Sequence, residues 1–457
     1  MALAQADGAQ QSWSSGFAFI LAAVGAAVGL GNIWKFPYVV GVSGGGAFVL
    51  VYIACVVFVA IPILIAELWI GRRGHHSPPA AMRRVAEGAG RSGAWSLVGW
   101  MGLIVGFLIA TYYSVIAGWT LAYIGKSGAD FGGASGADVA KQFDGLLADP
   151  LAMTGWHTLF MIIALLIVAR GLEGGIEKAV KFMMPALFVM LLLMIGYAAV
   201  EGDFKAGVQF LFSTDFSKID GPVVLTAIGQ AFFSIGVAMG LIMTYGSYVP
   251  KEVSLTKSAL IIAGADTLVA ILAGLMIFPL VFANGLDPAS GPGLVFQTLP
   301  TALADMAGGT IFGPLFFILL AFAAVTSIIA LLEPIIAYAE DKLYMSRKVA
   351  CVLFGFLAWA VGLATVFSFN IWSDVTPLDG IKALQGKTLF DLIDYFTANL
   401  MMPLGGILMA LFVGWRIRPE TLREDLQFAS PALFTLWLWM IRVVAPVAIL
   451  WVLYTSL

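Results

Sequence analysis

Eleven long apolar segments account for most of this sequence and leave few folds open to it. Most of them are long enough to cross the hydrocarbon core of a bilayer, about 30 Å, as a helix. Hydrophobic residues make up 61% of the chain and charged residues only 11%. Because lipid offers no hydrogen-bond partner to the backbone, such segments must be helical. The sequence therefore predicts an all-α polytopic membrane protein, with spans at residues 15–42, 46–70, 94–124, 155–169, 179–200, 222–248, 258–284, 310–343, 350–367, 389–415 and 431–454.

Charge is divided unequally between the connecting loops. With the N-terminus placed inside, the inner loops hold most of the 24 Lys and Arg residues and the outer loops hold few. Positively charged loops remain in the cytoplasm. We therefore expect a cytoplasmic N-terminus and, after an odd number of spans, an extracytoplasmic C-terminus. The outer loops 126–154, 201–221, 285–309 and 368–388 are expected to be irregular, and Cys55 and Cys351, both in apolar runs, are expected to form no disulfide.

The first apolar segment contains a cluster of helix-weakening residues. Gly25, Gly29 and Gly31 are followed closely by Asn32 and Pro37. Glycine lowers helix propensity and adopts unusual backbone angles. A break at mid-membrane is tolerated only where the freed backbone groups are buried in protein or line a polar cavity, so small ions and polar substrates are natural ligands. Glycines that only allow close helix packing would explain the same pattern.

A second interruption lies five spans further along the chain. Gly236 and Gly240 bracket it within the sixth apolar segment, and the polar Ser234 precedes it. This spacing is expected if spans one to five and six to ten are two structural repeats. Interrupted segments at corresponding positions of two repeats are the best sequence indication of a transporter's binding site.

Several motifs along the chain resemble those of the neurotransmitter:sodium symporter family. The resemblance implies the leucine-transporter fold: a 5+5 inverted repeat with helices 1 and 6 broken, plus an eleventh helix. It implies a cytoplasmic tail at 1–14, repeats at 15–200 and 222–415, an extracellular loop at 201–221, and an inner loop with the eleventh helix at 416–457. The motifs are Gly29-Leu-Gly-Asn-Ile-Trp-Lys-Phe-Pro37, Gly44-Gly-Gly-Ala-Phe48, Ile61-Pro62 with Glu67 and Gly71-Arg72, Gln230-Ala-Phe-Phe-Ser234, and Ala324-Val-Thr-Ser327.

The family's function is sodium-coupled symport by alternating access. For this chain the resemblance implies two Na⁺ ions, a neutral amino-acid substrate and a bacterial inner membrane. Na⁺ is a hard cation that prefers oxygen ligands. The first ion site is expected at the Ala27 carbonyl with the side chains of Asn32, Ser234 and Asp266. The second is expected at the carbonyls of Gly25, Val28 and Ala323 with the hydroxyls of Thr326 and Ser327, although these hydroxyls could also bond back to their own helix.

The substrate site is expected between the two broken helices. Freed amides near the first break would bind a carboxylate, assisted by the Tyr113 hydroxyl, and the side-chain positions are uncharged. A neutral side chain is expected because a charged one would be buried without a partner. In Ala238-Met239-Gly240, Ala238 has a Cβ where a glycine would leave room for an aromatic ring, which favours small or aliphatic substrates, although Gly236 returns some space. The full predicted set is Ala26, Ala27, Leu30, Gly31, Ile109, Tyr113, Phe233, Ser234, Gly236, Met239, Ser327 and Leu331.

Gates are expected on both sides of this site. Lys35 and Asp394 match the outer pair, with lysine in place of the usual arginine, so we expect a loose, water-bridged contact. Trp13, Tyr248 and Asp341 match the inner gate, but Gln10 stands where the family has an arginine, which leaves Asp341 without its usual partner. Glu67 matches a glutamate that braces the unwound segments by accepting their amides.

Chloride is expected to be dispensable. Chloride-dependent relatives hold the anion with a tyrosine, a glutamine and hydroxyls, and Tyr52, Gln230 and Ser234 match those positions. Ala270 replaces a typical serine ligand, whereas Asp266 replaces a typical asparagine. A fixed carboxylate beside two cations lowers their repulsion as chloride would.

Other classes of function remain as alternatives. A proton-coupled amino-acid permease of the same fold is the main one, but it would lack the Thr326–Ser327 pair. An enzyme is not expected, because His75, His76 and His157 do not have metal-binding spacing. No nucleic-acid partner is expected; the partners are the substrate and the bilayer, and the sequence leaves the oligomeric state open.

Overall fold

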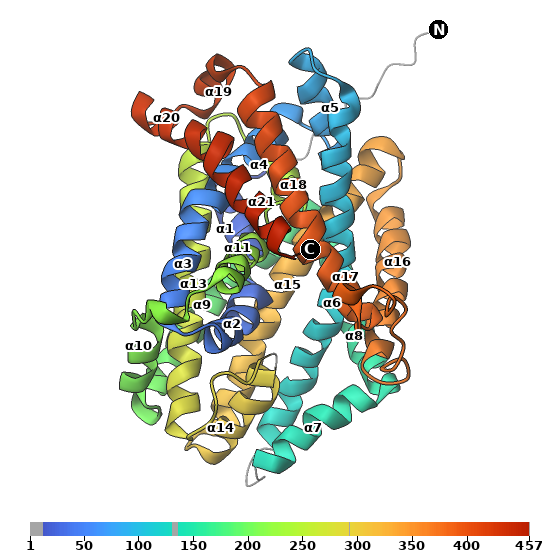
Figure 1. Ribbon diagram of the computed structural model, residues 1–457. Helices are drawn as coiled ribbons and strands as arrows, with labels where there is room; N and C mark the ends of the chain where they lie inside the picture. The colour runs from blue at the N-terminus through green and yellow to red at the C-terminus, as the bar shows by residue number, and fades with distance from the viewer. Residues whose placement is uncertain (1–11, 130–135, 292, 457) are drawn as a thin grey trace.

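The apolar segments fold as helices, most of which run along the long direction of the molecule (Figure 1). The computed structural model describes residues 12–129, 136–291 and 293–456. In this part of the chain, nine helices are long and apolar enough to cross a membrane. They cover Gly46–Gly74, Gly93–Gly128, Pro150–Val168, Leu172–Glu201, Leu255–Ala283, Gly309–Lys342, Arg347–Ser368, Leu389–Arg416 and Pro431–Trp451.

Individual elements within these spans carry the labels of Figure 1. Three spans consist of two α-helices joined by a π-helical turn, which keeps the chain running in one direction. The elements are α3 (Gly46–Cys55) with α4 (Ile61–Gly74), α6 (Ser96–Ala129), α8 (Pro150–Val168), α9 (Lys178–Glu201), α13 (Leu255–Ala283), α15 (Gly309–Lys342), α16 (Arg347–Ser368), α17 (Leu389–Tyr395) with α18 (Met402–Leu411), and α20 (Pro431–Trp439) with α21 (Ala445–Ser456).

Two further spans are broken, at the two positions that the sequence predicts. The first consists of α1 (Gly16–Ala27), a π-turn at Gly31–Lys35 and α2 (Phe36–Val42), with a bend of 45°. The second consists of α11 (Gly221–Ile235) and α12 (Leu241–Ser247). These two bring the described spans to eleven, as predicted.

The second break is enforced by backbone conformation. Gly236 and Gly240 have φ angles of 77° and 75°, and Ala238 between them has φ of 63°. A non-glycine residue in this left-handed region costs on the order of 1–3 kcal/mol. Such strain persists only where surrounding contacts fix the segment, so the break belongs to the native structure.

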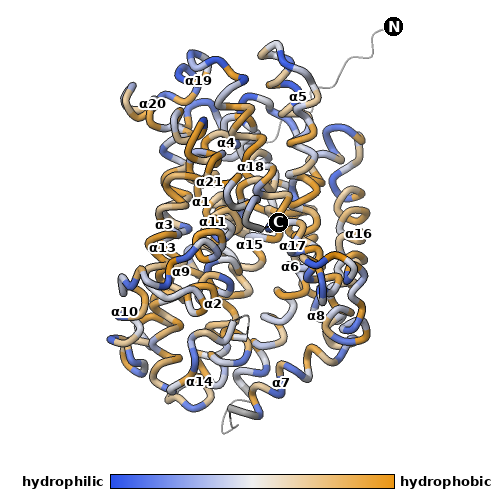
Figure 2. The backbone as a smooth tube through the Cα atoms, in the orientation of Figure 1, coloured by the Kyte–Doolittle hydropathy of each residue, from blue (hydrophilic) through white to orange (hydrophobic). Residues whose placement is uncertain are grey.

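The two ends of the bundle differ in charge and in the helices they carry. Figure 2 shows apolar residues along the middle of the bundle and polar residues at both ends. We call the end with α5 (Pro78–Gly88) and α19 (Pro419–Leu426) the basic face, because it carries the arginine-rich loops. The other end, with α7 (Gly136–Ala148), α10 (Phe204–Phe212) and α14 (Leu299–Asp305), is the opposite face.

The prediction of irregular outer loops is wrong in three of four cases. The segments 126–154, 201–221 and 285–309 contain α7, α10 and α14 respectively. Each is short and partly polar, and α7 and α10 bury one face on the bundle. Helices of this kind are too short and too polar to be recognised in the sequence as membrane spans.

The centre of the bundle is formed by the broken spans with α6 and α15. In α15, 83% of the most apolar stretch is buried, against 33% in α8. The helix α15 packs along α6 and against α1, so residues on these elements face the interior rather than lipid. Cys55 and Cys351 are buried and free, as predicted. Arg442 donates from Nε to the Gly414 carbonyl (2.6 Å) and ties the last span to the π-turn Phe412–Arg416 that follows α18.

Candidate functional site

The first break places backbone groups at the centre of the molecule. Helix α1 ends at Ala27, and Val28 is extended (ψ 101°). The Gly29 amide donates to Asn32 Oδ1 (2.9 Å), and the Leu30 amide donates to the Tyr113 hydroxyl (3.1 Å). A Cβ on Gly29 would lie 2.3 Å from Ser327 Oγ, so only glycine fits here. The loss of helical bonds is thus compensated by side chains from α6 and from the break itself.

Three predicted ion ligands form a buried cluster of polar atoms. Asn32 Nδ2 lies 3.0 Å from Ser234 Oγ and 2.7 Å from Asp266 Oδ1. Ser234 Oγ lies 2.8 Å from Asp266 Oδ2, and the Tyr52 hydroxyl lies 3.2 Å from the same oxygen. Asn32 and Asp266 are fully buried. The cluster joins the π-turn at Gly31–Lys35 to α11, α13 and α3, and Ala27, predicted for the same site, lines the neighbouring cavity.

No basic side chain neutralises this carboxylate. Among the described residues, no Lys, Arg or His nitrogen lies within 4 Å of Asp266. A buried carboxylate needs a charge partner or must take up a proton. The cluster therefore has the chemistry of a site for a small cation.

A second group of oxygens lies between α15 and the end of α1. Ser327 Oγ is 3.2 Å from the Ala26 carbonyl and 3.5 Å from the Val28 carbonyl, so this hydroxyl crosses to the broken helix. Thr326 Oγ1 bonds to the Ala323 carbonyl of its own helix (3.0 Å). Gly25 packs directly on Thr326, since a Cβ there would lie 3.4 Å from the threonine Cβ. The structure thus brings the predicted second set together, while Thr326 also makes the local bond considered as an alternative.

A small cavity lies beside both breaks. Its volume is about 20 Å³, and a cavity needs roughly 10–15 Å³ by this measure to hold one water molecule. It must therefore expand to admit anything larger. It is lined by Ala26, Ala27, Gly29, Gly31, Ile109, Tyr113, Phe233, Gly236, Met239, Leu241, Ser327 and Leu331.

The lining agrees with the predicted substrate residues at all but two positions. Leu30 contributes its amide to Tyr113 rather than its side chain, and Ser234 belongs to the Asp266 cluster. Gly29 and Leu241 are lining residues that the sequence prediction missed. Gly29 lies within the first motif, and Leu241 begins the helix after the second break. None of the lining residues is charged.

The expectation that the Ala238 methyl limits the size of the substrate is wrong. The Ala238 methyl does not line the cavity; it faces α18, 3.2 Å from where a Cβ on Gly405 would lie. Only Met239 of that segment faces the cavity, and its side chain is flexible. The side-chain evidence for small substrates is therefore absent.

Phe233 separates the cavity from a larger vestibule. The vestibule has a volume of about 500 Å³ and lies between Phe233 and the opposite face. Lys35 and Asp394 both line it. The Lys35 Nζ is 4.2 Å from the centre of the Phe233 ring, and Asp394 accepts a hydrogen bond from the Tyr112 hydroxyl (3.1 Å). The two predicted gate residues thus face one space without a direct ion pair between them.

On the basic face, Trp13 is buried against α12. Its indole is 3% exposed, and Nε1 donates to the Tyr245 carbonyl (3.1 Å). The next residue, Ser14, donates its amide to Glu177 Oε2 (3.2 Å), and Lys181 pairs with the same carboxylate at 2.5 Å. Gln10 lies outside the described residues.

Tyr248 and Asp341, both predicted for the inner gate, have different partners. Tyr248 donates its hydroxyl to Glu333 (3.0 Å), and Glu333 is paired with Arg347. Asp341 instead contacts His76 Nδ1 (3.0 Å) and Ser77 Oγ (2.9 Å). The reason is distance along α15: Asp341 lies eight residues beyond Glu333, or about 12 Å at 1.5 Å per residue.

Glu333 and Arg347 were missed as site residues. Glu333 is fully buried, and a second acid, Glu340, lies 2.9 Å from Arg347. A carboxylate within an apolar span is by itself an indication of a functional or structural role. Glu67 takes the expected bracing position, because its Oε1 accepts the amide of Ala238 in the second break.

Comparisons with known proteins agree with this geometry. The model of the sodium:neurotransmitter symporter family matches residues 10–130 and 149–457. An uncharacterized sodium-dependent transporter of Bacillus subtilis is 36% identical over 96% of both chains. One from Haemophilus influenzae is 35% identical over 98% of both. The sodium-dependent dopamine transporter of Bos taurus is 23% identical, over 98% of this chain and 69% of its own.

A solved structure shows the same fold. The crystal structure of MhsT in complex with L-phenylalanine superposes with a TM-score of 0.90 at 40% identity, covering 98% of this chain and all of that one. The predicted leucine-transporter fold, with its inverted repeats and eleventh helix, is thereby confirmed. The match over nearly the whole chain places it among secondary transporters and not among enzymes. The chain is a multi-pass membrane transporter and belongs to the sodium:neurotransmitter symporter family.

Proposed function

We propose that this protein is a symporter that couples the entry of two Na⁺ ions to that of one neutral, apolar amino acid, without chloride. The observation that carries the proposal is the buried Asp266 carboxylate. It lies among Asn32, Ser234 and Tyr52, with no basic side chain of the described residues near it. A small cation with oxygen ligands compensates such a charge.

The first ion requires one local change in this cluster. Asn32 presents Nδ2 to Asp266 and its Oδ1 to the Gly29 amide. An asparagine has an oxygen acceptor on one side of its amide and a nitrogen donor on the other. Turning the amide over presents Oδ1 to the ion and frees the Gly29 amide for the substrate. Ion and substrate binding are thereby linked through one side chain.

The second ion is supported by the oxygens between α1 and α15. The carbonyls of Ala26 and Val28 converge on Ser327 Oγ, and the Thr326 hydroxyl lies one residue away. A cation here would bind α1 to α15 more tightly than the single hydroxyl does. The Ser327 contact across the helices distinguishes this arrangement from a purely local serine bond.

The substrate proposal is based on the composition of the cavity and on one neighbour. No charged side chain lines the cavity, and the Tyr113 hydroxyl and the Leu30 amide lie at its edge. The neighbouring structure, MhsT, holds L-phenylalanine. We therefore include aromatic amino acids, such as phenylalanine, among the substrates together with aliphatic ones.

The absence of a chloride requirement follows from the donors around Asp266. Tyr52 and Ser234, which match chloride ligands, give their hydroxyls to the carboxylate. Ala270 offers no further donor. The carboxylate supplies the negative charge that chloride would bring.

The basic face is proposed to be cytoplasmic. Its arginine-rich loops follow the positive-inside pattern, which puts α5 and α19 inside and the vestibule outside. The membrane would be the inner membrane of a bacterium, with the N-terminus inside and the C-terminus outside.

Uptake into proteoliposomes tests sodium coupling and substrate class together. Purified protein should accumulate phenylalanine or leucine when an inward Na⁺ gradient is imposed. Uptake in K⁺ or choline medium should equal that of protein-free vesicles. Equal uptake in all three media would contradict sodium coupling, and uptake of glutamate or lysine in preference to both would contradict the substrate class.

A second comparison tests the role of Asp266. The parent should transport equally in chloride and gluconate, whereas Asp266→Asn should be inactive or active only in chloride. The exposed Asp374→Asn serves as the charge-matched control and should behave as the parent. A parent that stops in gluconate would contradict chloride independence without affecting the proposal for sodium.

A further inference from the structure

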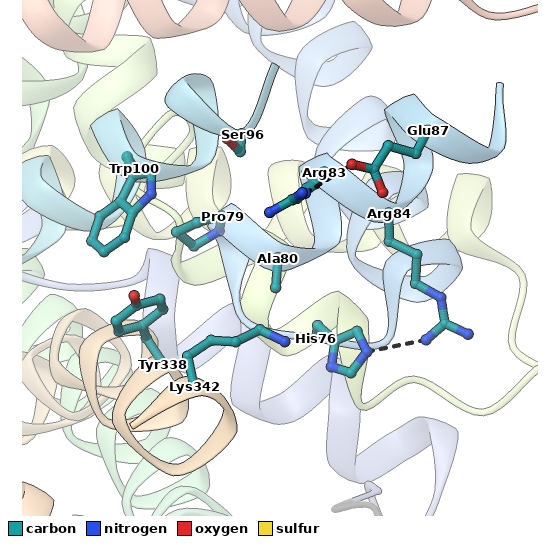
Figure 3. Close-up of a pocket in the computed structure, with 10 residues that line it drawn as sticks. All are labelled: His76, Pro79, Ala80, Arg83, Arg84, Glu87, Ser96, Trp100, Tyr338 and Lys342. Carbon is teal, nitrogen blue, oxygen red and sulfur yellow. Dashed lines mark hydrogen bonds and ion pairs between the residues drawn. The ribbon is translucent and has the colours of Figure 1, made fainter. Parts of the chain in front are cut away.

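A second large cavity lies at the basic face, away from the substrate site. Its volume is about 510 Å³, and it is formed by α5, the start of α6 and the end of α15. Figure 3 shows three cationic side chains of this cavity, Arg83 and Arg84 from α5 and Lys342 from α15. None of them belongs to the ion and substrate sites described above.

The cations outnumber the acids that face them. Arg83 is paired with Glu87 (2.8 Å), and Lys342 lies 3.6 Å from Asp341. Arg84 has no carboxylate within 4 Å in the described part of the chain. The acids thus leave the Arg84 charge without a counter-ion.

The contact between Arg84 and His76 indicates which ring nitrogen of His76 carries a proton. Arg84 Nη1 lies 3.1 Å from His76 Nε2, and His76 Nδ1 lies 3.0 Å from Asp341 Oδ1. A guanidinium can only donate, so Nε2 must accept and Nδ1 must carry the proton that Asp341 accepts. His76 is therefore neutral here, and it orients Arg84 without cancelling its charge.

One wall of the cavity is aromatic and continues into an apolar surface. The rings of Trp100 and Tyr338 pack edge to face with centroids 4.6 Å apart. Leu97 and Ile104 lie one turn before and after Trp100 on α6, and their side chains are 68% and 43% exposed. Residues three and four apart share one face of a helix. The aromatic wall of the cavity therefore continues into an exposed apolar strip on α6.

We propose that this cavity binds a phosphate group, and that the surrounding surface favours the headgroup of an anionic phospholipid as its source. Arginine forks bind phosphate oxygens in pairs, and Arg84 has the free charge to do so beside Lys342. The aromatic wall suits the interfacial region of a bilayer, and the Leu97–Ile104 strip gives the acyl chains an apolar path. The site is independent of Na⁺ and of the transported substrate.

Lipid binding to the purified full-length protein tests the proposal. Dioleoylphosphatidylglycerol and dioleoylphosphatidylcholine are titrated separately, and bound lipid is counted by native mass spectrometry. The double variant Arg84→Gln with Lys342→Gln should bind phosphatidylglycerol about 25-fold more weakly than the parent, since each cation removed near an anionic surface weakens binding about fivefold. Ala80→Glu, which adds an acid to the cavity wall and keeps both cations, should weaken binding in the same direction.

The matched control removes two exposed charges from the same face outside the cavity. Lys251→Gln with Lys257→Gln should bind phosphatidylglycerol as the parent does. Size-exclusion profiles and thermal unfolding midpoints show whether each variant is folded. A second arm replaces lipid with sodium phosphate and measures the unfolding midpoint.

The two arms distinguish the two sources of phosphate. Preferential phosphatidylglycerol binding that is lost in both cavity variants supports the lipid. A midpoint raised by sodium phosphate in the parent alone, with no preference between the lipids, supports a soluble phosphate ligand and overturns the lipid source. Cavity variants that match the lysine control in both arms overturn the site altogether.

Discussion

Replacing Ser327 with alanine removes one hydroxyl from the contact between α15 and the broken first span. The side chain is 6% exposed, and its Oγ lies 3.2 Å from the Ala26 carbonyl and 3.5 Å from the Val28 carbonyl. The substitution removes only this oxygen and its hydrogen. The variant therefore tests the oxygen alone and leaves the packing of the helices nearly unchanged.

The expected magnitude depends on whether an ion binds there. Without an ion, one neutral hydrogen bond contributes about 1 kcal/mol to the free energy of unfolding. A hydroxyl facing a charged partner contributes about 1.5–3 kcal/mol, and each 1.4 kcal/mol is tenfold in affinity. Ser327→Ala should therefore raise the half-saturating Na⁺ concentration by about 10- to 100-fold. Stability in Na⁺-free medium should fall by only about 1 kcal/mol.

The assay is a Na⁺ titration of the purified protein followed by its thermal unfolding midpoint, with proteoliposome uptake at the same Na⁺ concentrations. Ser114→Ala is the matched control, because Ser114 is equally buried but bonds only to carbonyls of its own helix, at 2.9 and 3.1 Å. The control should keep the Na⁺ dependence of the parent. If both variants show the same half-saturating Na⁺ concentration, the second ion site is in the wrong place.

Three further substitutions test other parts of the site. Gly29→Ala should lower uptake about 100-fold, because its Cβ would displace the break by about 1 Å. The control Gly125→Ala, whose Cβ meets nothing within 4 Å, should leave uptake unchanged. Normal uptake by Gly29→Ala would refute the close approach of Gly29 to Ser327. Asp394→Ala should slow uptake more than it weakens Na⁺-dependent substrate binding, measured by equilibrium binding, and normal uptake would exclude a gating role. Arg347→Gln should lower the free energy of unfolding by about 3–5 kcal/mol because it leaves the buried Glu333 without its cation; an unchanged thermal midpoint would show that the pair is unimportant.

The sequence predicts the fold and the core of the site because both depend on local chemistry. Glycines that break an apolar segment leave a signal in the chain itself, and the breaks at Gly29 and Gly236 are found where that signal is. Oxygen-bearing residues such as Asn32 and Asp266 stand out equally clearly within apolar runs. The resemblance to the family predicts that these two residues converge, and the structure brings them to hydrogen-bonding distance.

The parts that the sequence does not predict depend on how helices rotate and meet. The methyl of Ala238 points away from the cavity because the residue has a positive φ angle, which no pattern of hydrophobicity reveals. Tyr248 reaches Glu333 instead of Asp341 because the crossing of α12 and α15 decides which turn it meets. The helices of the opposite face are too short and too polar to be detected as spans.

On the basic face, the N-terminal segment is held in place although the expected arginine is absent from the sequence of the tail. Ser14 is a hydrogen-bond donor to Glu177, so the tail itself needs no positive charge, and Lys181 supplies the cation instead. The buried ion pair lies inside the bundle and not at the tail; it joins Glu333 on α15 to Arg347 on α16.

This arrangement would lower the cost of an opening movement at the basic face. If α12 moved away from α15, it would break the hydrogen bond of Tyr248 to Glu333 (3.0 Å), a contact to a charged group worth about 1.5–3 kcal/mol. The Glu333–Arg347 pair could stay intact, since both partners lie on helices other than α12. Breaking that pair would cost about 3–5 kcal/mol, because it would leave a buried charge alone. In such a movement the ion pair would be a stationary acceptor, and Tyr248 the part of the contact that α12 releases.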